Sequence, residues 1–236
     1  VIALIDGDIL TYRIGFAAQD STEGIVRARV DSFMSDLLLY NADCDDYEGY
    51  LTGSGNFRHD IAVTAKYKGN RKADRPVHYD FIRRYLTSEW AFHMVDGQEA
   101  DDAIGIEAYR RFSEGDLDYL ICTIDKDLDM IPGKHYNFVK NLRYDVDEKQ
   151  AIKWFYTQIL TGDRIDNIIG LKGIGPVKAA KILEGARDES DLYHRVVAAY
   201  EANDDTEERV LENGRLLWIR RRPEETWSPP EPEGSL

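Results

Sequence analysis

Cysteine is scarce in this chain, and the two that occur, Cys44 and Cys122, are too few for a disulfide framework. Cys122 lies in an apolar run, where we expect a reduced and buried thiol. The histidines show no zinc-ligand spacing, so we expect no zinc site. No apolar run reaches the roughly 18 to 20 residues that a membrane helix needs, and no charged-then-apolar leader opens the chain. We therefore expect a soluble, cytoplasmic protein with no membrane partner.

Basic residues are in the minority, 30 against 44 acidic ones, and the net charge is −14. An acidic total argues against a nucleic-acid partner, which usually meets a basic surface. The basic residues are nevertheless concentrated. The segment KYKGNRKADR (66–75) is rich in them, and Lys172, Lys178 and Lys181 surround a Gly-Ile-Gly turn. Localised basic surface therefore keeps a nucleic-acid partner open.

The order of apolar runs and amphipathic segments predicts the fold class. Val1 to Ile5 is typical of a buried strand, followed at Asp6 by a polar turn. Further strands are expected at 47–52, 119–124 and 136–139, and helices at 32–40, 78–88, 100–112 and 149–161. Alternating strands and helices predict an α/β fold with a mostly parallel central sheet that helices flank on both faces. Proline is frequent near the end, so we expect a mobile tail over the last dozen or so residues.

Several acidic residues follow the predicted strands. Asp6 ends the first one, and Asp125 and Asp127 follow the strand at 119–124 two residues apart, which can place both carboxylates on one side of extended chain. Ligands of open parallel sheets bind beyond the carboxyl ends of the strands. Other acids stand three residues apart, a spacing at which helical side chains can face the same way. They are Glu99 and Asp102, with Asp101 beside them, and Asp163 and Asp166.

Each acidic group alone is typical of a helix cap or a solvated turn. Together, converging carboxylates would repel one another and need a compensating charge. Oxygen ligands without histidine or cysteine select magnesium or manganese. Two such ions about 3.5 to 4 Å apart are a known arrangement for phosphodiester hydrolysis.

A glycine turn follows the last two acids. In LKGIGPVKAAKIL (171–183), Gly173 and Gly175 let the backbone turn tightly and approach a phosphate, and Pro176 suits the first turn of a helix. The turn is equally compatible with a simple corner between two helices. Phosphate contacts of this kind position DNA without reading its bases.

Five motifs, in order and spacing, resemble those of the 5′-nuclease superfamily. They are IDGDILTYR (5–13), YKGNRK (67–72), EADD (99–102), TIDKDLDMIP (123–132) and TGDRIDNIIGLKGIG (161–175). The superfamily includes flap endonucleases, the 5′-nuclease domain of bacterial DNA polymerase I and bacteriophage 5′-to-3′ exonucleases. The short linkers resemble the phage exonucleases most.

The resemblance implies a PIN-like nuclease domain at 1–160 and a helix-three-turn-helix DNA-binding region at 161–200 that completes the active site. Residues 201–236 are then a C-terminal extension with a flexible end. The implied ligands of two divalent ions, Mg²⁺ or Mn²⁺, are Asp6, Glu99, Asp101, Asp102, Asp125, Asp127, Asp163 and Asp166. The implied catalytic residues are Lys68, Arg71, Asp6, Glu99, Asp101 and Asp125.

The resemblance also implies DNA contacts at Arg13, Tyr67, Lys68, Arg71, Lys72, Lys172, Gly173, Gly175 and Lys178. Tyr67 is expected to stack on a base at the entrance of the site. The family holds K⁺ in its hairpin through backbone carbonyls, and the candidates here are Leu171 and Ile174. The implied substrates are DNA with 5′ ends, nicks or flaps and the RNA of RNA–DNA hybrids, with replication proteins as partners and a bacterial host cell as the location of a phage enzyme.

The chain departs from the family pattern after the second predicted strand. Relatives carry an aspartate there, whereas this chain has Gly53 and Ser54. Asp8 is a candidate to compensate through a water molecule. Two alternatives to a metal-dependent 5′-nuclease therefore stay open: a structure-specific DNA-binding protein with a weakened nuclease centre, and an RNA-cleaving PIN nuclease. The second is less favoured, because toxin-type PIN domains lack the glycine hairpin.

Overall fold

The computed structural model describes residues 1–70 and 74–231, which pack as two compact units. Unit 1 comprises residues 1–56, 73–147 and 221–223, and unit 2 comprises 57–72, 148–220 and 224–236, each in its described part. Arg71 and Lys72, which the sequence analysis placed at the DNA, lie outside the described residues. The division at residues 160 and 200 concerns functional regions and stays a prediction.

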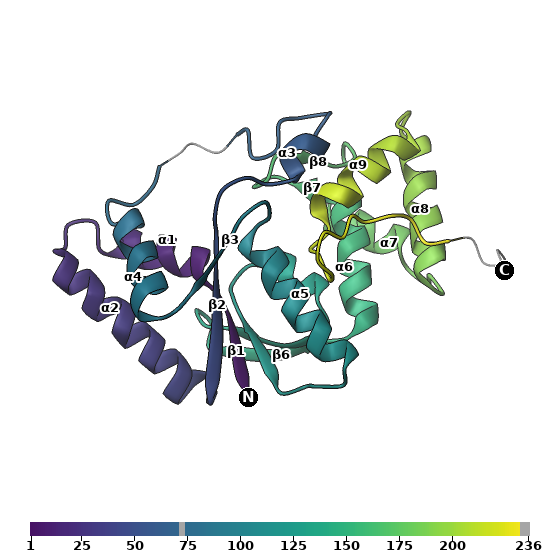
Figure 1. Cartoon of the computed structure of the whole chain (residues 1–236). Coiled ribbons are helices and arrows are strands. Elements are labelled where there is room, and N and C mark those ends of the chain that lie inside the picture. Colours follow the sequence, from purple (N-terminus) through teal and green to yellow (C-terminus); the bar gives the residue numbers. More distant parts are fainter. Residues whose placement is uncertain (71–73, 232–236) are drawn as a thin grey trace. The chain divides into compact units, whose positions relative to one another are not determined.

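A six-stranded sheet is the centre of unit 1 in the described chain, in the order β3-β2-β1-β4-β5-β6. Figure 1 labels β1, β2, β3 and β6 of this sheet. All neighbouring strands are parallel except the antiparallel pair β5 and β6. The strands are β1 (Ile2–Asp6), β2 (Asp46–Thr52), β3 (His93–Val95), β4 (Tyr119–Cys122), β5 (Gly133–Asn137) and β6 (Leu142–Val146). The predicted mostly parallel sheet is confirmed, although β5 begins and ends earlier than the expected strand at 136–139.

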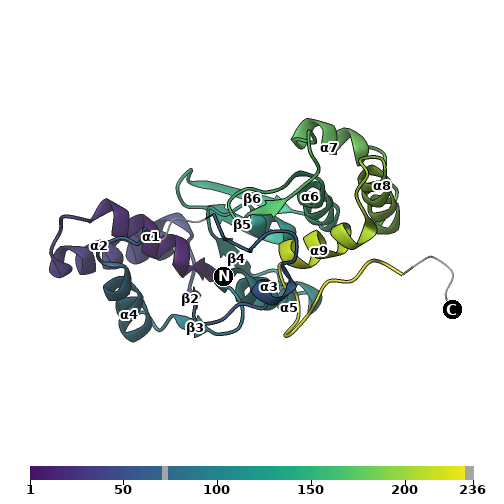
Figure 2. The same ribbon diagram turned by 90° about the horizontal axis from the view of Figure 1, so that it is seen from above.

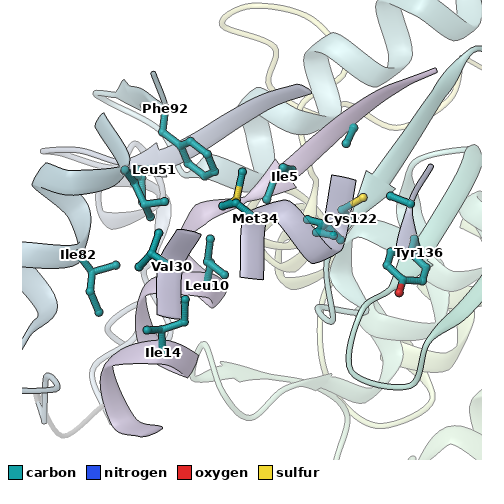
Figure 3. Packing of buried hydrophobic residues seen from close by; sticks show 14 of the residues in the cluster. Ile5, Leu10, Ile14, Val30, Met34, Leu51, Ile82, Phe92, Cys122 and Tyr136 are labelled. Atoms are coloured by element: carbon teal, nitrogen blue, oxygen red, sulfur yellow. The ribbon is translucent and has the colours of Figure 1, made fainter. Parts of the chain in front are cut away.

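Helices cover both faces of this sheet, with α1, α2 and α4 on one side and α5 on the other (Figure 1). Their bounds are α1 (Gly7–Ala17), α2 (Glu23–Asp36), α4 (Tyr79–Glu89) and α5 (Ala100–Ser113), with a π-helical turn η1 (Leu37–Asn41) and a 3₁₀ turn η2 (Asp127–Met130). Alternate strand residues face opposite sides, so Ile5 and Cys122 join the buried cluster with Val30 of α2 and Ile82 of α4 (Figure 3). This packing fixes the sheet edge from which the acidic residues project.

The junction of β1 and α1 differs from the predicted polar turn. Helix α1 begins at Gly7, directly after the strand, because the Asp6 side chain caps it by accepting a hydrogen bond from the Ile9 amide. A Cβ at Gly7 would lie 2.6 Å from the carbonyl oxygen of Tyr50, so only glycine allows this close approach. Asp6 is therefore held at the very end of the strand.

Unit 2 is mainly helical in its described residues. It contains α3 (Arg58–Ile61), α6 (Glu148–Thr161), the hairpin strands β7 (Gly162–Asp163) and β8 (Ile168–Ile169), α7 (Pro176–Ile182), α8 (Glu189–Glu201) and α9 (Glu207–Leu217). Helices α6, α8 and α9 pack against one another (Figure 2). In the part of the chain that the structure describes, no helix is long and apolar enough to cross a membrane.

The C-terminal segment corrects the expectation of a mobile tail. Trp227 is buried, and its ring lies 5.2 Å from that of Phe155 and 6.2 Å from that of Tyr193, centroid to centroid. The proline content indicated a tail, but burying a large indole surface stabilises an ordered path along α6 and α8. The remainder of the predicted tail, 232–236, lies outside the described residues.

The segment that precedes Lys68 is anchored to α9. The buried guanidinium of Arg58 donates to the carbonyl oxygens of Leu216 and Trp218 at 2.8 and 2.7 Å, at the end of that helix. Glu212 of α9 accepts hydrogen bonds from the amides of Val63 and Thr64. A buried arginine at helix-terminal carbonyls thus fixes this segment, whose only regular element in the described residues is the short helix α3.

Candidate functional site

Asp6, the last residue of β1, is a buried acid at the carboxyl end of the sheet. Among the described acids at this edge, only the helix-capping Asp102 is more buried. The Asp6 side chain is 2% exposed and accepts hydrogen bonds from the Ile9 amide and from the Thr123 hydroxyl, at 3.1 and 2.9 Å. Burial, reinforced by the charges of Asp8 and Asp125, raises the pKa of Asp6 to about 7. The two hydrogen bonds oppose this increase. A bound cation would stabilise the charged form of this carboxylate.

The loop after β4 carries the next two acids. Thr123 links it to β1, because its hydroxyl donates to Asp6 and also accepts from the Asp125 amide at 3.0 Å. Asp125 Oδ1 accepts from the Asp127 amide at 2.9 Å, and Asp127 begins the 3₁₀ turn η2. Because β4 ends at Cys122 and the chain then turns, the extended conformation assumed for Asp125 and Asp127 is not present.

The acids at the start of α5 act first as helix caps. Glu99 and Asp102 form a capping box, in which each side chain accepts a hydrogen bond from the other residue's backbone amide. Asp102 is fully buried, and the Ala100 amide donates to the Thr52 hydroxyl at the end of β2. This contact ties the acidic helix start, including Asp101, to the same sheet edge.

Asp8 is balanced by a cation within the protein. Its Oδ1 lies 2.7 Å from Nη1 of Arg83, and the Thr52 amide donates to both of its carboxylate oxygens. Arg83, which is also largely buried, donates to the Thr52 carbonyl as well. Asp8 therefore binds the end of β2 and pairs with Arg83. Its expected role, to compensate for the missing acid through a water molecule, stays a prediction.

Gly53 and Ser54 stand where the resemblance predicts an acid after β2. The Gly53 amide donates to the Val95 carbonyl, and the Ser54 amide and hydroxyl both donate to Oδ1 of Asp96, at 2.6 and 2.8 Å. These hydrogen bonds lower the pKa of Asp96. An exposed carboxylate at the end of β3 therefore lies beside the glycine.

Unit 2 carries the last two predicted acids on the β7–β8 hairpin. Asp163 Oδ1 accepts from the Ile165 amide at 2.6 Å, which shapes the hairpin loop. Asp166 is buried; its carboxylate accepts from the Tyr67 hydroxyl at 2.6 Å, and its carbonyl accepts from the Lys68 amide at 2.8 Å. The basic segment is therefore attached to the acidic hairpin within this unit.

The structure places Tyr67 and Lys68 side by side and contradicts the expectation that Tyr67 stacks on a base. Tyr67 is 2% exposed, so its ring is not available to stack on a base. The ring instead lies 5.1 Å from the Lys68 ammonium, which is also 3.6 Å from the Asp166 carboxylate. Lys68 adopts a φ of 53°, a left-handed conformation that is rare for a residue other than glycine. The hydrogen bonds to Asp166 hold this strained residue in place.

The glycine turn begins helix α7. Gly173 has a φ of 77°, Gly175 precedes the helix, and Pro176 occupies its first position, as the sequence predicted. The Lys178 ammonium donates to the Gly173 carbonyl at 2.8 Å, while the Ile174 amide donates to the Leu171 carbonyl. Lys172 is exposed on this turn, as is Arg13 on α1 in unit 1.

The donors at the edge of unit 1 suit a hard divalent ion. In the described residues, no group of three or more His, Cys, Asp or Glu side chains is arranged to hold a metal. Mg²⁺, however, usually keeps several water molecules and binds through one or two carboxylates instead of a complete protein cage. Oxygen donors that include a buried carboxylate of raised pKa therefore fit a hydrated Mg²⁺ or Mn²⁺ ion.

A comparison with protein families decides the identification. The model described as "5'-3' exonuclease, N-terminal resolvase-like domain" matches residues 1–161 of the 236. The chain belongs to the 5′-to-3′ exonuclease family. It thereby belongs to a family of nucleases within the 5′-nuclease superfamily, as its motifs predicted.

Curated relatives of this 5′-to-3′ exonuclease family member include bacterial DNA polymerases I. The enzyme of Rhizobium leguminosarum is 38% identical over 218 residues, which cover 81% of this chain and 21% of the relative. That of Deinococcus radiodurans is 27% identical over 242 residues, or 90% of this chain and 24% of the relative. The chain spans between about a fifth and a quarter of the length of these polymerases.

Solved structures share the exonuclease fold. The T5 D15 protein, co-crystallised with metal ions, has a TM-score of 0.66 at 18% identity and covers 92% of this chain and 88% of its own. The catalytic core of Rad2, in complex with a DNA substrate, has a TM-score of 0.55 at 17% identity, with coverages of 86% and 64%. These likenesses confirm the mostly parallel, helix-flanked fold.

The eight predicted acidic ligands are divided between the two units. Asp6, Glu99, Asp101, Asp102, Asp125 and Asp127 belong to unit 1, and Asp163 and Asp166 to unit 2. Their ligand roles stay predictions. Sequence reasoning missed Thr123, Arg83 and Asp96 at the same edge. For Asp96 the sequence holds a signal, because this acid directly follows the short strand HMV and precedes the EADD motif.

Proposed function

We propose that this protein is a divalent-metal-dependent 5′-nuclease that hydrolyses phosphodiester bonds of DNA near 5′ ends and leaves 5′-phosphate products. The observation that carries the proposal is the family match over residues 1–161, which contain the acidic edge built around Asp6. The raised pKa of Asp6 supports it, because a buried acid beside two others is stabilised by a positively charged ligand. Two Mg²⁺ or Mn²⁺ ions are the proposed cofactors.

The proposed roles of the acids follow from their contacts. Divalent ions, when bound, lower the pKa of water and neutralise charge on the phosphoryl oxygens. Asp6, oriented by Thr123, and Asp125, oriented by its contact with the Asp127 amide, hold such ions at the edge of unit 1. Glu99 and Asp101 act with them at the start of α5, and Asp102, Asp127, Asp163 and Asp166 complete the proposed ligand set.

Basic residues hold the DNA in this proposal. Lys68, oriented by Asp166, and Arg71 stabilise the negative charge that develops on the cleaved phosphate. Contacts to the phosphate backbone come from Arg13, Lys72, Lys172 and Lys178 and from the backbone of Gly173 and Gly175 in a helix-three-turn-helix element. Because these contacts replace counterions, DNA binding weakens steeply as the salt concentration rises.

Finer features of the family extend the proposal. K⁺ binds the carbonyls of Leu171 and Ile174 in the turn before α7. The substrates are DNA with 5′ ends, nicks or flaps and the RNA of RNA–DNA hybrids. Replication proteins are the partners, and the cytoplasm of a bacterial host is the location.

A denaturing-gel time course on 5′-labelled duplex, nicked and 5′-flap DNA tests the proposal, with Mg²⁺, Mn²⁺ or EDTA. We expect short labelled products only with a metal, and their lengths separate stepwise exonuclease action from flap cleavage. Glu99→Gln keeps the capping geometry and should abolish cleavage while DNA binding persists. The control is Asp46→Asn, at the opposite end of β2, which should cleave like the parent. Metal-independent cleavage, or full activity of Glu99→Gln, would contradict the proposal.

Gly53 favours one alternative, a structure-specific DNA-binding protein with a weakened nuclease centre, because it stands where the family resemblance predicts an acid. That reading expects tight binding to the same DNA with no cleavage under any metal. Substrates that carry an RNA strand test the remaining alternative, an RNA-cleaving nuclease, in the same assay.

A further inference from the structure

In the described part of unit 1, five parallel strands end at one edge of the sheet, in the order β3-β2-β1-β4-β5. Three of them lead into an acid there. Asp6 is the last residue of β1, Asp125 follows β4 in the loop, and Asp96 follows β3 directly. Strand β2, between β1 and β3, is instead followed by Gly53. Ligands of such sheets bind beyond the carboxyl ends of the parallel strands. At this edge, the position directly after β2 carries no acidic side chain.

The carboxylate of Asp96 occupies the space that a side chain at residue 53 would need. A Cβ built on Gly53 would collide with Oδ1 of Asp96 and would lie 3.1 Å from its carboxyl carbon. It would also lie 2.8 Å from the carbonyl oxygen of Val95. A carboxylate on β2 and this placement of Asp96 are therefore mutually exclusive, and glycine at position 53 is what makes room for the acid of the neighbouring strand.

Asp96 is also held firmly for an exposed residue. The amide and the hydroxyl of Ser54 both donate to Oδ1, at 2.6 and 2.8 Å. The Gly53 amide binds the Val95 carbonyl and the Gly97 amide binds the Ser54 carbonyl, so the chain after β2 is paired with the chain after β3 on both sides of Asp96. Both bonds use the same carboxylate oxygen, and none of the described residues donates to Oδ2, which can accept from a water molecule or bind a cation.

We propose that Asp96 is a further acidic residue of the divalent-cation site, and that it supplies from the end of β3 the negative charge that is missing at the end of β2. The inference rests on the proposed function. The Asp96 carboxylate lies where the side chain of the predicted acid would be, although Asp96 stands at a different position in the sequence. Motif positions alone therefore count one carboxylate too few. It also removes the feature that favoured a weakened nuclease centre.

The competing explanation is that Asp96 only caps the turn at Ser54. Asp96→Asn separates the two, because asparagine keeps an oxygen that accepts both Ser54 bonds and loses only the charge. The matched control is Asp46→Asn, which removes the same charge from an exposed aspartate that accepts the Tyr47 amide at the other end of β2. Asp96→Glu retains the charge with altered geometry, and Ser54→Ala removes one of the two groups that orient Asp96.

Mn²⁺ titration of the full chain without DNA, followed by electron paramagnetic resonance, gives a readout that does not depend on cleavage. We expect Asp96→Asn to weaken Mn²⁺ binding about tenfold, the scale found for residues that support a metal site. Asp96→Glu should stay within about threefold of the parent, Ser54→Ala should lose about threefold, and Asp46→Asn should match the parent. The melting temperature of Asp96→Asn in EDTA should equal that of the parent.

Unchanged Mn²⁺ affinity of Asp96→Asn, or an equal loss in Asp96→Glu, would overturn the assignment of Asp96. If Asp96→Asn does not fold, the capping explanation gains support and Ser54→Ala together with Asp96→Glu decides between the two. A parent chain that neither binds Mn²⁺ nor cleaves DNA with it refutes the proposed function itself. A parent that does both, beside an Asp96→Asn variant of equal affinity, refutes the role of Asp96 alone.

Discussion

Asp6 and Asp8 are two residues apart at the same sheet edge, yet their surroundings differ. Asp6 is buried, is oriented by Thr123, and has a pKa raised by burial and by its acidic neighbours. Asp8 forms an ion pair with Arg83 at 2.7 Å and receives hydrogen bonds from the Thr52 amide. The protein thus balances the charge of Asp8 itself, whereas in the proposed site a bound cation balances that of Asp6. We infer that the pairing with Arg83 marks Asp8 as a structural acid, in contrast to the proposed ligand Asp6.

The largest expected effect separates Asp125, a proposed metal ligand like Asp6, from Asp8, which pairs with Arg83. Asp125→Asn should lower kcat about 10³-fold, on the scale of losing a group that stabilises developing charge. Asp8→Asn should lower it by less than about tenfold, because this carboxylate pairs with Arg83. Single-turnover cleavage of a 5′-flap substrate in Mg²⁺ measures both, with DNA affinity as the control. Equal losses in the two variants would show that Asp8 belongs to the reaction centre.

The second prediction removes the internal cation. Arg83→Met keeps an apolar stem but leaves Asp8 without its ion pair, and the free energy of unfolding should fall by about 2 kcal/mol, below the value for a fully buried pair because Asp8 is partly exposed. Urea unfolding measures the loss. The neighbouring Arg84→Met is the control, since Arg84 is exposed on α4 and its replacement should change stability by less than about 0.5 kcal/mol. Equal effects at the two positions would refute the structural role of the Asp8–Arg83 pair.

The third prediction concerns the pH dependence of the metal-free protein. The pKa of Asp6 is about 7 in the folded protein, against an ordinary value of 3.8. Between these pH values the folded protein holds a proton on Asp6 that the unfolded chain has lost, so stability falls as the pH rises. Asp6→Asn avoids the buried charge. In EDTA at pH 8 the variant should be more stable than the parent by on the order of 2 kcal/mol, and the difference should vanish near pH 4. Thermal unfolding at both pH values measures it, and a constant difference would contradict the raised pKa.

Local patterns in the sequence predicted much of the fold and less of the site. Apolar runs indicated β2 and β4, and helical spacing indicated α4 and α6 to within about two residues, because these signals depend on neighbouring residues. The start of α1 was missed, since a glycine between two aspartates is typical of a turn. The structure shows that the Asp6 cap and the packing of Gly7 against β2 together let the helix begin there.

Pairings between distant residues could not be predicted. The hydroxyl of Tyr67 binds Asp166, 99 residues away, and that of Thr123 binds Asp6, 117 residues away. A tyrosine in a basic segment is compatible with base stacking when its burial is unknown. Likewise, Asp96, whose carboxylate lies against Gly53, follows a different strand, and only the parallel register of β2 and β3 places the two residues side by side. Sequence motifs therefore name candidate ligands, while strand register decides which side chains meet.

The smallest expected effect tests whether the Thr123 hydroxyl stabilises the charge of Asp6. Thr123→Val removes a hydroxyl that stabilises the charged form of Asp6, so the variant should lose about 1.5 kcal/mol at pH 8 in EDTA and clearly less at pH 5, where Asp6 is largely protonated. Thr11→Val is the control, because the buried hydroxyl of Thr11 donates to the neutral carbonyl of Gly7 at 2.7 Å. Its loss, about 1 kcal/mol, should be the same at both pH values. If the Thr123 variant is also insensitive to pH, its hydroxyl serves packing and not the charge of Asp6, and the contrast between Asp6 and Asp8 then rests on Arg83 alone.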